Sequence, residues 1–370
     1  MEHSFTPVIR NILTELYGAA SNDIFDKSLL IQYINEKTAS ADKGSKSRAS
    51  FGNLYAIYIV TEDYLAKEYD VKGTYSEYEG AKYTDLSTRQ KELPFGGKLQ
   101  NHSLNNRMNA EFQRFFPTSD IIPIIRNLET SRYWINENLL QVVCGERVYN
   151  IATAIIRIID EYVKVKQDSF QRFIKQCEEL KAIEEEEHPT DVRDFIVKML
   201  APNVDARLFE IVSYAILKHY YREQEIIWGY SLDNLTHDYL HLYKTGRTNA
   251  NDGGIDFVMR PLGRFFQVTE TLDFKKYFLD IDKIERFPIT FIVKSTETVD
   301  TLKTKLREDA IKSYRITAIV DKYMACIEEL INIQQLHNYL TKLEQNEQLS
   351  YVLDEIILQS KLEYNYEDEE

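Results

Sequence analysis

A carboxylate, an amide and a hydroxyl stand at spacings that could build a metal site within residues 243–295. Asp256 follows an Asp-Gly-Gly turn and stands in a short apolar run that is typical of a strand. A Pro-Leu-Gly turn then leads into a second strand at 264–269, which carries Gln267 and Thr269. In such a hairpin the three polar side chains can face one another, and their oxygen atoms suit a divalent cation.

The elements that would position this hairpin follow from the spacing of apolar residues. Glu210 stands beside the apolar stripe of a predicted helix that precedes the hairpin, so its carboxylate can be directed toward it. The pattern predicts helices at 205–221, 274–284 and 298–313, strands at 255–259, 264–269, 288–294 and 316–320, and a helical remainder to residue 362.

A series of motifs follows in order between residues 205 and 320, about a third of the chain. An acid-bearing helix (LFEIVSYAIL) precedes an acid-bearing strand (DGGIDFV), a hairpin strand (RFFQVTE), a helix and a buried strand (PITFIVKS). This order resembles the PD-(D/E)xK nuclease superfamily, in particular its Mrr-like restriction endonucleases. The resemblance implies a restriction-endonuclease-like α/β (α+β) domain, in which helices flank a mixed central sheet.

The resemblance also implies roles for individual residues. Asp256 matches the metal-binding aspartate, and Gln267 matches the Mrr-like glutamine at the second metal position. Glu210 matches the helix acid that many relatives direct at the metal. The implied cofactor is Mg²⁺, which prefers hard oxygen ligands and lowers the pKa of an attacking water.

Thr269 departs from the motif, because the family has a lysine there that orients the water and stabilises negative charge on the phosphate. The Thr269 hydroxyl could position the water, with Glu270 brought in by a bulge as the base or as a ligand. Alternatively, an ammonium group could come from Lys275 or Lys276 just downstream, or from Lys294 on the neighbouring strand.

Two further alternatives remain open. The sequence Asp273-Phe274-Lys275 supplies an acid and a lysine at the motif spacing, but it lies where the strand should have ended, so it ranks below the Gln267 alignment. The other alternative is a nuclease fold that has lost its activity and only binds DNA.

Basic and amide side chains gather in parts of the chain that could contact DNA. Residues 82–116 are rich in Arg, Lys, Asn and Gln, which contact phosphates and read base edges. A loop decorated with amides is the alternative interpretation there, and a flexible surface loop is the alternative for the basic segment 38–48. The candidate DNA-binding residues are Lys43, Lys46, Arg48, Arg89, Lys98, Asn101, Asn105, Arg107, Lys244 and Arg247.

The chain length suits two domains. Apolar residues at helical spacing predict helices at 6–17, at 26–37 with Asp26 as its cap, and at 150–180. The acidic run followed by His-Pro predicts a boundary between residues 187 and 188. We therefore expect a mainly helical DNA-recognition domain at 1–187 and the nuclease-like domain, with C-terminal helices, at 188–370.

Composition limits the class of protein. An apolar fraction of 44% allows a sizeable core, and the net charge of -14 means that any nucleic-acid surface must be local. The three cysteines lack zinc spacing and do not suggest a disulfide framework. No signal peptide and no apolar run of membrane-spanning length is evident, so we expect a soluble protein of the cytoplasm.

These expectations combine into a sequence-specific double-stranded DNA endonuclease, a type II restriction enzyme that hydrolyses phosphodiester bonds with Mg²⁺. Cutting two strands at a palindromic site favours a homodimer, and restriction implies pairing with a DNA methyltransferase. The alternative is a catalytically inactive protein of the same fold that binds DNA or regulates defence.

Overall fold

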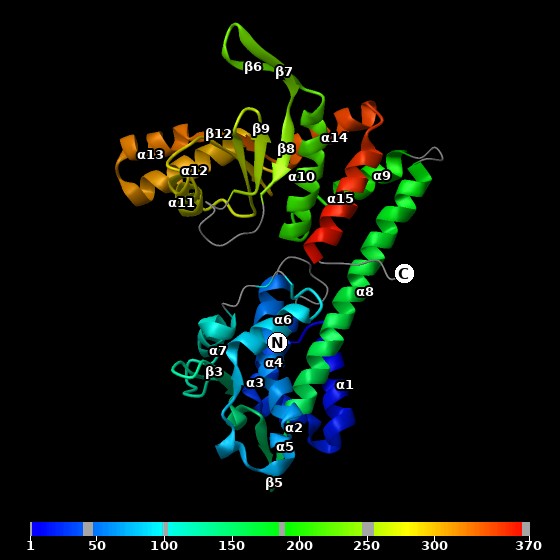
Figure 1. The fold of residues 1–370 in the computed structure, drawn as a ribbon, viewed down its shortest axis with the longest axis vertical. Helices are drawn as coiled ribbons and strands as arrows, with labels where there is room; N and C mark the ends of the chain where they lie inside the picture. Colours follow the sequence, from blue (N-terminus) through cyan, green and yellow to red (C-terminus); the bar gives the residue numbers. More distant parts are fainter. Residues whose placement is uncertain are drawn as a thin grey trace. The chain divides into compact units, whose positions relative to one another are not determined.

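The structure is a computed structural model, and it describes residues 2–39, 47–97, 99, 103–184, 189–245 and 255–364. It divides the chain into two compact units, the first formed by Met1–Phe173 with Leu362–Glu370 and the second by Ile174–Lys361. Figure 1 labels the elements of both units.

The first unit consists mostly of helices. Its helices are α1 (Thr6–Tyr17), α2 (Ser21–Lys27), α3 (Leu29–Thr38), α4 (Ser47–Ala66), α5 (Tyr69–Lys72), α6 (Tyr83–Glu92), α7 (Met108–Phe115) and the first part of α8 (Ala152–Glu184), with short turns η1 (Gly18–Ala20), η2 (Tyr75–Glu77), η3 (Ser103–Arg107) and η4 (Glu137–Leu139). Its strands are β1 (Ala81–Lys82), β2 (Ile124–Asn127), β3 (Arg132–Ile135), β4 (Gln141–Cys144) and β5 (Arg147–Asn150).

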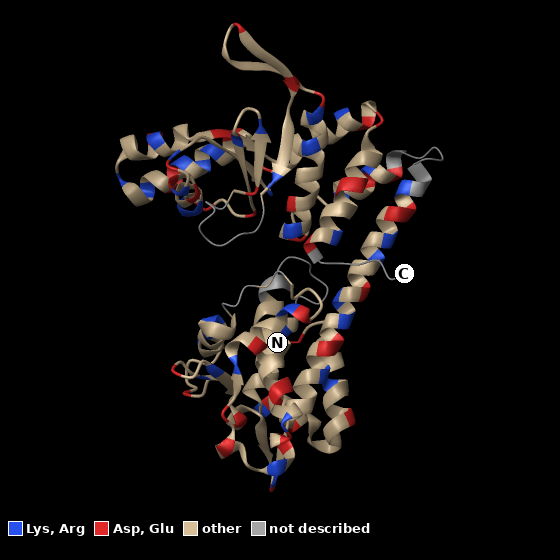
Figure 2. Ribbon diagram, in the orientation of Figure 1, with Lys and Arg blue, Asp and Glu red and all other residues tan. Residues whose placement is uncertain are grey.

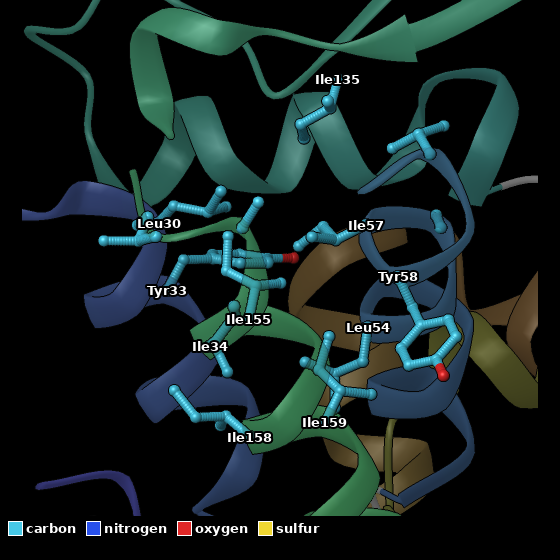
Figure 3. Close-up of a cluster of buried hydrophobic side chains, with 14 of the residues drawn as sticks. Leu30, Tyr33, Ile34, Leu54, Ile57, Tyr58, Ile135, Ile155, Ile158 and Ile159 are labelled. Atoms are coloured by element: carbon cyan, nitrogen blue, oxygen red, sulfur yellow. The ribbon is translucent and has the colours of Figure 1, made fainter. Parts of the chain in front are cut away.

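The apolar core of the first unit is built around α3, α4 and α8 (Figure 3). Ile155, Ile158 and Ile159 lie on one stripe of α8 and are fully or almost fully buried. The predicted helix at 150–180 is therefore confirmed as α8. The predicted helix at 26–37 is instead broken into α2 and α3, and Ser28 rather than Asp26 caps α3, because the Ser28 side chain accepts a hydrogen bond from Ile31 N at 3.2 Å.

The second unit contains the mixed sheet. Its helices, besides the end of α8, are α9 (Pro189–Lys198), α10 (Ala206–Arg222), α11 (Phe274–Lys283), α12 (Val299–Tyr314), α13 (Thr317–Ala325), α14 (Ile333–Gln345) and α15 (Leu349–Tyr364). Its strands are β6 (Glu225–Ser231), β7 (Asn234–Tyr239), β8 (His241–Lys244), β9 (Phe257–Arg260), β10 (Arg264–Thr269), β11 (Ile289–Val293) and β12 (Ile327–Ile331).

The sheet has five strands in the order β12-β11-β10-β9-β8. Strands β8, β9 and β10 form an antiparallel meander, whereas β10, β11 and β12 are parallel. Parallel neighbours need a crossover connection, and α11 provides it between β10 and β11, while α12 and α13 provide it between β11 and β12. The expected mixed central sheet flanked by helices is therefore confirmed.

Helices cover the sheet on both faces. On one face α11, α12 and α13 form an apolar cluster with β11 and β12, in which the rings of Tyr277 and Phe291 lie 4.4 Å apart. On the other face α10 packs against the meander, with the Tyr214 ring 5.1 Å from the Phe257 ring. The predicted helix at 205–221 and the predicted strand at 264–269 are confirmed as α10 and β10, and the rings of Tyr221 and Phe266 lie 6.3 Å apart between them.

The last strand of the sheet is not the segment that the sequence predicts. Residues 316–320 begin helix α13, and only Val320 of that helix is buried. The segment predicted to be helical, 327–331, instead forms β12 and pairs with β11. Both are short apolar runs, and periodicity alone does not separate a helix from a strand at that length.

The division between the units falls inside α8, after Phe173, whereas the acidic run predicts a boundary at 187/188. The end of α8 belongs to the second unit because it packs beside α15, where Lys181 Nζ lies 2.6 Å from Asp354 Oδ1.

Charges of both signs are interspersed on the helices of the second unit (Figure 2). On α12 and α13, for example, Arg307 pairs with Asp321 at 2.9 Å. Within the described ranges, no helix is both long enough and apolar enough to cross a membrane.

Candidate metal centre

Asp256 lies immediately before β9 and next to β10, the strand that carries Gln267. Phe257 pairs with Phe266 in the ladder, and the Asp256 backbone extends it, because Asp256 N donates to Phe266 O at 3.0 Å. On its other side, Thr245 N donates to Asp256 O at 2.9 Å. The backbone of Asp256 is therefore fixed from both neighbouring strands. The Gly-Gly turn before it lies outside the described residues.

The carboxyl group of Asp256 lies in an environment that disfavours its charge. Burial and then the nearby carboxylate of Glu210 raise the pKa of Asp256 to about 7. The Val268 N–H opposes this effect by donating to Asp256 Oδ2 at 2.7 Å, and the positive charges of Arg207 and Lys276 oppose it as well. A cation bound here would therefore stabilise the charged form of Asp256.

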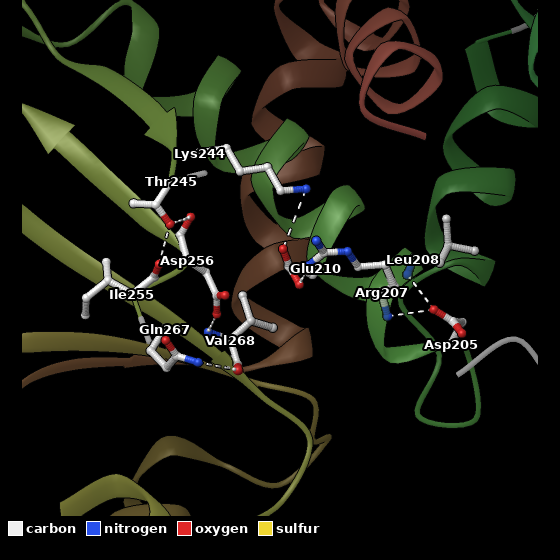
Figure 4. Close-up of polar contacts among 10 residues, drawn as sticks. All are labelled: Asp205, Arg207, Leu208, Glu210, Lys244, Thr245, Ile255, Asp256, Gln267 and Val268. Carbon is white, nitrogen blue, oxygen red and sulfur yellow. Dashed lines mark hydrogen bonds and ion pairs between the residues drawn. The ribbon is translucent and has the colours of Figure 1, made fainter. Parts of the chain in front are cut away.

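Helix α10 brings Glu210 to the meander. The helix begins at Asp205, whose carboxylate caps it by accepting from Arg207 N at 2.6 Å and from Leu208 N at 2.9 Å. One turn later, Glu210 forms an ion pair with Arg207, and its Oε1 lies 3.6 Å from Lys244 Nζ. Figure 4 shows the carboxylates of Glu210 and Asp256 directed into the same space between α10 and the meander.

The side chain of Gln267 contributes an unpaired oxygen. Its amide Nε2 donates to Val268 O at 3.3 Å, whereas its buried Oε1 has no hydrogen-bond partner in the described part of the chain. An unpaired buried acceptor costs free energy, on the order of 1–3 kcal/mol, unless a ligand satisfies it. The oxygen is therefore a ready ligand for a cation.

The donors of this site fit Mg²⁺. Asp256 and Glu210 bring two carboxylates from the meander and from α10 into one space, and β10 carries the unpaired amide oxygen of Gln267 next to Val268, the residue that donates to Asp256. Among the described residues, no three Asp, Glu, His or Cys side chains gather closely enough to hold a metal by themselves. Mg²⁺ commonly uses one or two carboxylates and keeps several waters, so this small donor set is adequate.

Thr269 and Glu270, which follow Gln267 on the chain, contact different lysines. The Thr269 hydroxyl donates to Thr271 O at 3.1 Å and accepts from Lys276 Nζ at 3.4 Å. Glu270 instead pairs with the buried Lys294, whose Nζ lies 2.7 Å from Glu270 Oε1.

Lys275 lies in the first turn of α11. Its N–H donates to the capping Asp273 at 3.0 Å, and its side chain is exposed. Asp273 is therefore the N-cap of α11. In the alternative Asp273-Phe274-Lys275 alignment, the acid caps a helix and does not lie on a strand of the sheet.

The candidate DNA-binding residues are only partly described. Arg89 forms a bidentate ion pair with Glu62, in which Nε donates to Oε2 at 2.9 Å and Nη2 donates to Oε1 at 2.8 Å. Asn105 lies between Tyr83 and Tyr133, within 3.4 and 3.3 Å of their hydroxyls. Arg107 is exposed, and Lys244 lies at the candidate metal centre. The predictions for Lys43, Lys46, Lys98, Asn101 and Arg247, and for the side chain of Arg48, lie outside the described residues.

Arg207 is the residue of this site that the sequence analysis overlooked. It stands three positions before Glu210 on α10, and residues at that spacing face each other on a helix. The spacing of opposite charges was therefore a usable signal, although such pairs are common on exposed helices and rarely mark a site.

Comparison of the chain with models of protein families, with curated proteins and with solved structures finds no match. A function for this chain has to be argued from its own residues.

Proposed function

We propose that the chain is a Mg²⁺-dependent endonuclease for double-stranded DNA, of the type II restriction class. One observation carries the proposal: the carboxylates of Asp256 and Glu210 share the space between α10 and the meander, and the unpaired amide oxygen of Gln267 lies on the adjacent strand β10. A site with this donor set suits a hard cation and a phosphate ligand more readily than it suits an apolar or neutral substrate.

The order of the elements supports the same class. The acid-bearing helix α10, the hairpin of β9 and β10, the helix α11 and the buried parallel strand β11 follow one another. This is the order in which the PD-(D/E)xK resemblance expects a helix acid, the metal-binding aspartate and the second metal position.

The proposed reaction is hydrolysis of a phosphodiester bond. A water oxygen bonds to phosphorus in line with the leaving group, the bond from phosphorus to the 3′ oxygen breaks, the attacking water gives up a proton to solvent, and the leaving oxygen takes one up. Mg²⁺, when bound, supplies a Lewis acid that activates water and neutralises charge on the phosphate. Asp256, Glu210 and Gln267 are the residues that would hold it.

The charged neighbours of these ligands favour a polyanion. Arg207 and Lys244 place two positive charges beside Glu210, so the site is not a purely acidic one. Asp256 is fixed by its backbone and by Val268, which keeps its carboxylate oriented and limits the reorganisation that binding requires.

The remaining parts of the proposal concern partners. We assign sequence recognition to the first unit, supported by the amide-rich composition of residues 82–116. Cleavage of both strands is proposed for a homodimer, and a paired DNA methyltransferase would protect the host sites.

A second candidate is a DNA-binding or defence-regulating protein without catalysis. Two observations favour it: Thr269 stands where the motif has lysine, and Glu210 is already neutralised by Arg207 and Lys244. Such a protein would bind DNA through the same positive side chains without hydrolysing it.

Plasmid cleavage separates the two candidates. The purified protein is incubated with methylated and with unmethylated plasmid in Mg²⁺ or Mn²⁺, beside an Asp256→Ala variant and a control variant, Asp238→Asn, on the β6–β7 hairpin. Discrete fragments from the wild type and the control, and none from Asp256→Ala, support the endonuclease. Absence of wild-type cleavage on both plasmids contradicts it.

A further inference from the structure

The candidate metal centre lacks a cation on the strand that carries Gln267, because the next inward-facing residue is Thr269. Phosphodiester hydrolysis adds negative charge to the phosphoryl oxygens in the transition state, and a fixed positive group beside them lowers the barrier. If the proposed function holds, one of the cations around the site must provide that charge.

The other described cations near the site are each paired with a carboxylate or a carbonyl. Lys294 is buried and held by Glu270 at 2.7 Å and by the carbonyl of Val204. Lys244 and Arg207 both lie against Glu210. These contacts tie each group to a carboxylate or a carbonyl rather than to the space in front of Thr269.

Lys276 differs from these residues. Its ammonium group lies 3.4 Å from Thr269 Oγ1, and the residue is exposed, so a ligand can reach it. The ammonium group thus reaches β10 at Thr269, two residues after Gln267.

Helix α11 fixes the backbone position of Lys276. The capping Asp273 fixes the start of the helix, and the next residue after Lys276, Tyr277, is fully buried against Phe291. Lysine in the first turn of a helix is unfavourable with the helix dipole, so helix stability does not account for Lys276.

We propose that Lys276 is the catalytic cation of this site, carried by α11 instead of the strand, and that its ammonium group contacts a non-bridging oxygen of the scissile phosphate. This inference rests on the proposed endonuclease function. Thr269 acts as a positioning residue, because its hydroxyl is short enough to leave room for the lysine of α11 and accepts a hydrogen bond from it.

The test compares neighbouring lysines in the full-length protein. Lys276→Met removes the charge and keeps the apolar stem, Lys276→Arg keeps a charge, and Lys275→Met is the matched control on the same turn. We expect Lys276→Met to lower the plasmid cleavage rate by about 10²-fold or more, with an unchanged melting temperature. Lys276→Arg should retain more activity than Lys276→Met, and Lys275→Met should cleave like the wild type.

A second readout does not depend on catalysis. Lysine acylation followed by mass spectrometry is carried out on the wild-type protein with and without a short duplex, in Ca²⁺ to prevent turnover. We expect the duplex to protect Lys276 and to leave Lys275 reactive. Equal reactivity of Lys276 with and without bound duplex would overturn the inference.

Different cleavage results would contradict the assignment of Lys276 and the proposed endonuclease function. If the wild type cleaves, Asp256→Ala does not, and Lys276→Met cleaves as fast as Lys275→Met, the endonuclease stands and the assignment of Lys276 is wrong. If the wild type does not cleave at all, the proposed function is wrong and the assignment of Lys276 with it.

Discussion

At the scale of single residues, Asp256 shows how the fold prepares a site for a cation. Its carboxyl group loses hydration and meets the charge of Glu210, and together these effects raise its pKa from an ordinary 3.8 to about 7. The same residue retains a hydrogen bond from Val268 N at 2.7 Å, which keeps it in place in either protonation state.

The first prediction concerns the stability of an Asp256→Asn variant. Because the pKa of Asp256 is raised in the folded state, the wild type loses stability as pH rises from about 4 to 7 and keeps that loss above pH 7. The variant has no such loss, so its unfolding free energy should exceed that of the wild type at pH 8.5. Each unit by which the pKa is raised corresponds to about 1.4 kcal/mol, so the gain should be measurable.

Urea denaturation at pH 8.5 and at pH 4 measures this difference. It should be largest at the higher pH and nearly absent at the lower one. A variant that is less stable than the wild type at pH 8.5 would show that Asp256 is a favourable structural charge.

The second prediction concerns Mg²⁺ itself. A ligand that binds only the folded state stabilises it, by about 2.7 kcal/mol at a hundred times its Kd. We expect Mg²⁺ at pH 8.5 to raise the melting temperature of the wild type and to leave that of Asp256→Asn unchanged. Matched ionic strength in NaCl is the control, and an equal rise in both proteins would place the cation elsewhere.

At the scale of elements, the sequence correctly predicted helices and strands that have a long apolar pattern or a capping residue at their start. The run from Phe274 carries an apolar stripe after a capping aspartate, and α11 forms there. The short apolar runs at 316–320 and 327–331 lack such marks, and their assignments as strand and helix were interchanged. Their true states depend on pairing with β11, which is a contact distant in sequence.

The site was predictable to a similar degree. The placement of Asp256 and Gln267 on one hairpin follows from local sequence, because β9 pairs with β10. The approach of Lys276 to Thr269 depends on how α11 turns back over the sheet. Sequence alone left Lys275, Lys276 and Lys294 as equivalent alternatives because their positions relative to the strands are set by tertiary packing.

The third prediction concerns the β6–β7 hairpin, which carries exposed apolar residues such as Tyr230 and Leu232 and no Lys or Arg (Figure 2). A Cβ at Gly229 would lie 2.0 Å from Asn234 O, so Gly229→Ala must separate the strands. We expect hydrogen exchange to show loss of protection in β6 and β7 with little change in the global melting temperature. Ser231→Ala on the same hairpin is the control, and retained protection in Gly229→Ala would contradict the account.

At the scale of the whole molecule, a chain of net charge -14 is proposed to cut a polyanion. Long-range attraction cannot account for this, so binding must depend on local groups such as Arg207, Lys244 and Lys276. Affinity for DNA should therefore be modest and sensitive to salt. The contacts with the bases that would give specificity are proposed for the first unit.

The measurement that tests the central claim most directly is cleavage of supercoiled plasmid in Mg²⁺ by the wild type and by Asp256→Asn, side by side at pH 8.5. The account predicts discrete wild-type fragments bearing a 5′ phosphate and a 3′ hydroxyl, and intact supercoiled plasmid with the variant. Intact plasmid with the wild type in every divalent metal, or equal cleavage by both proteins, would contradict it.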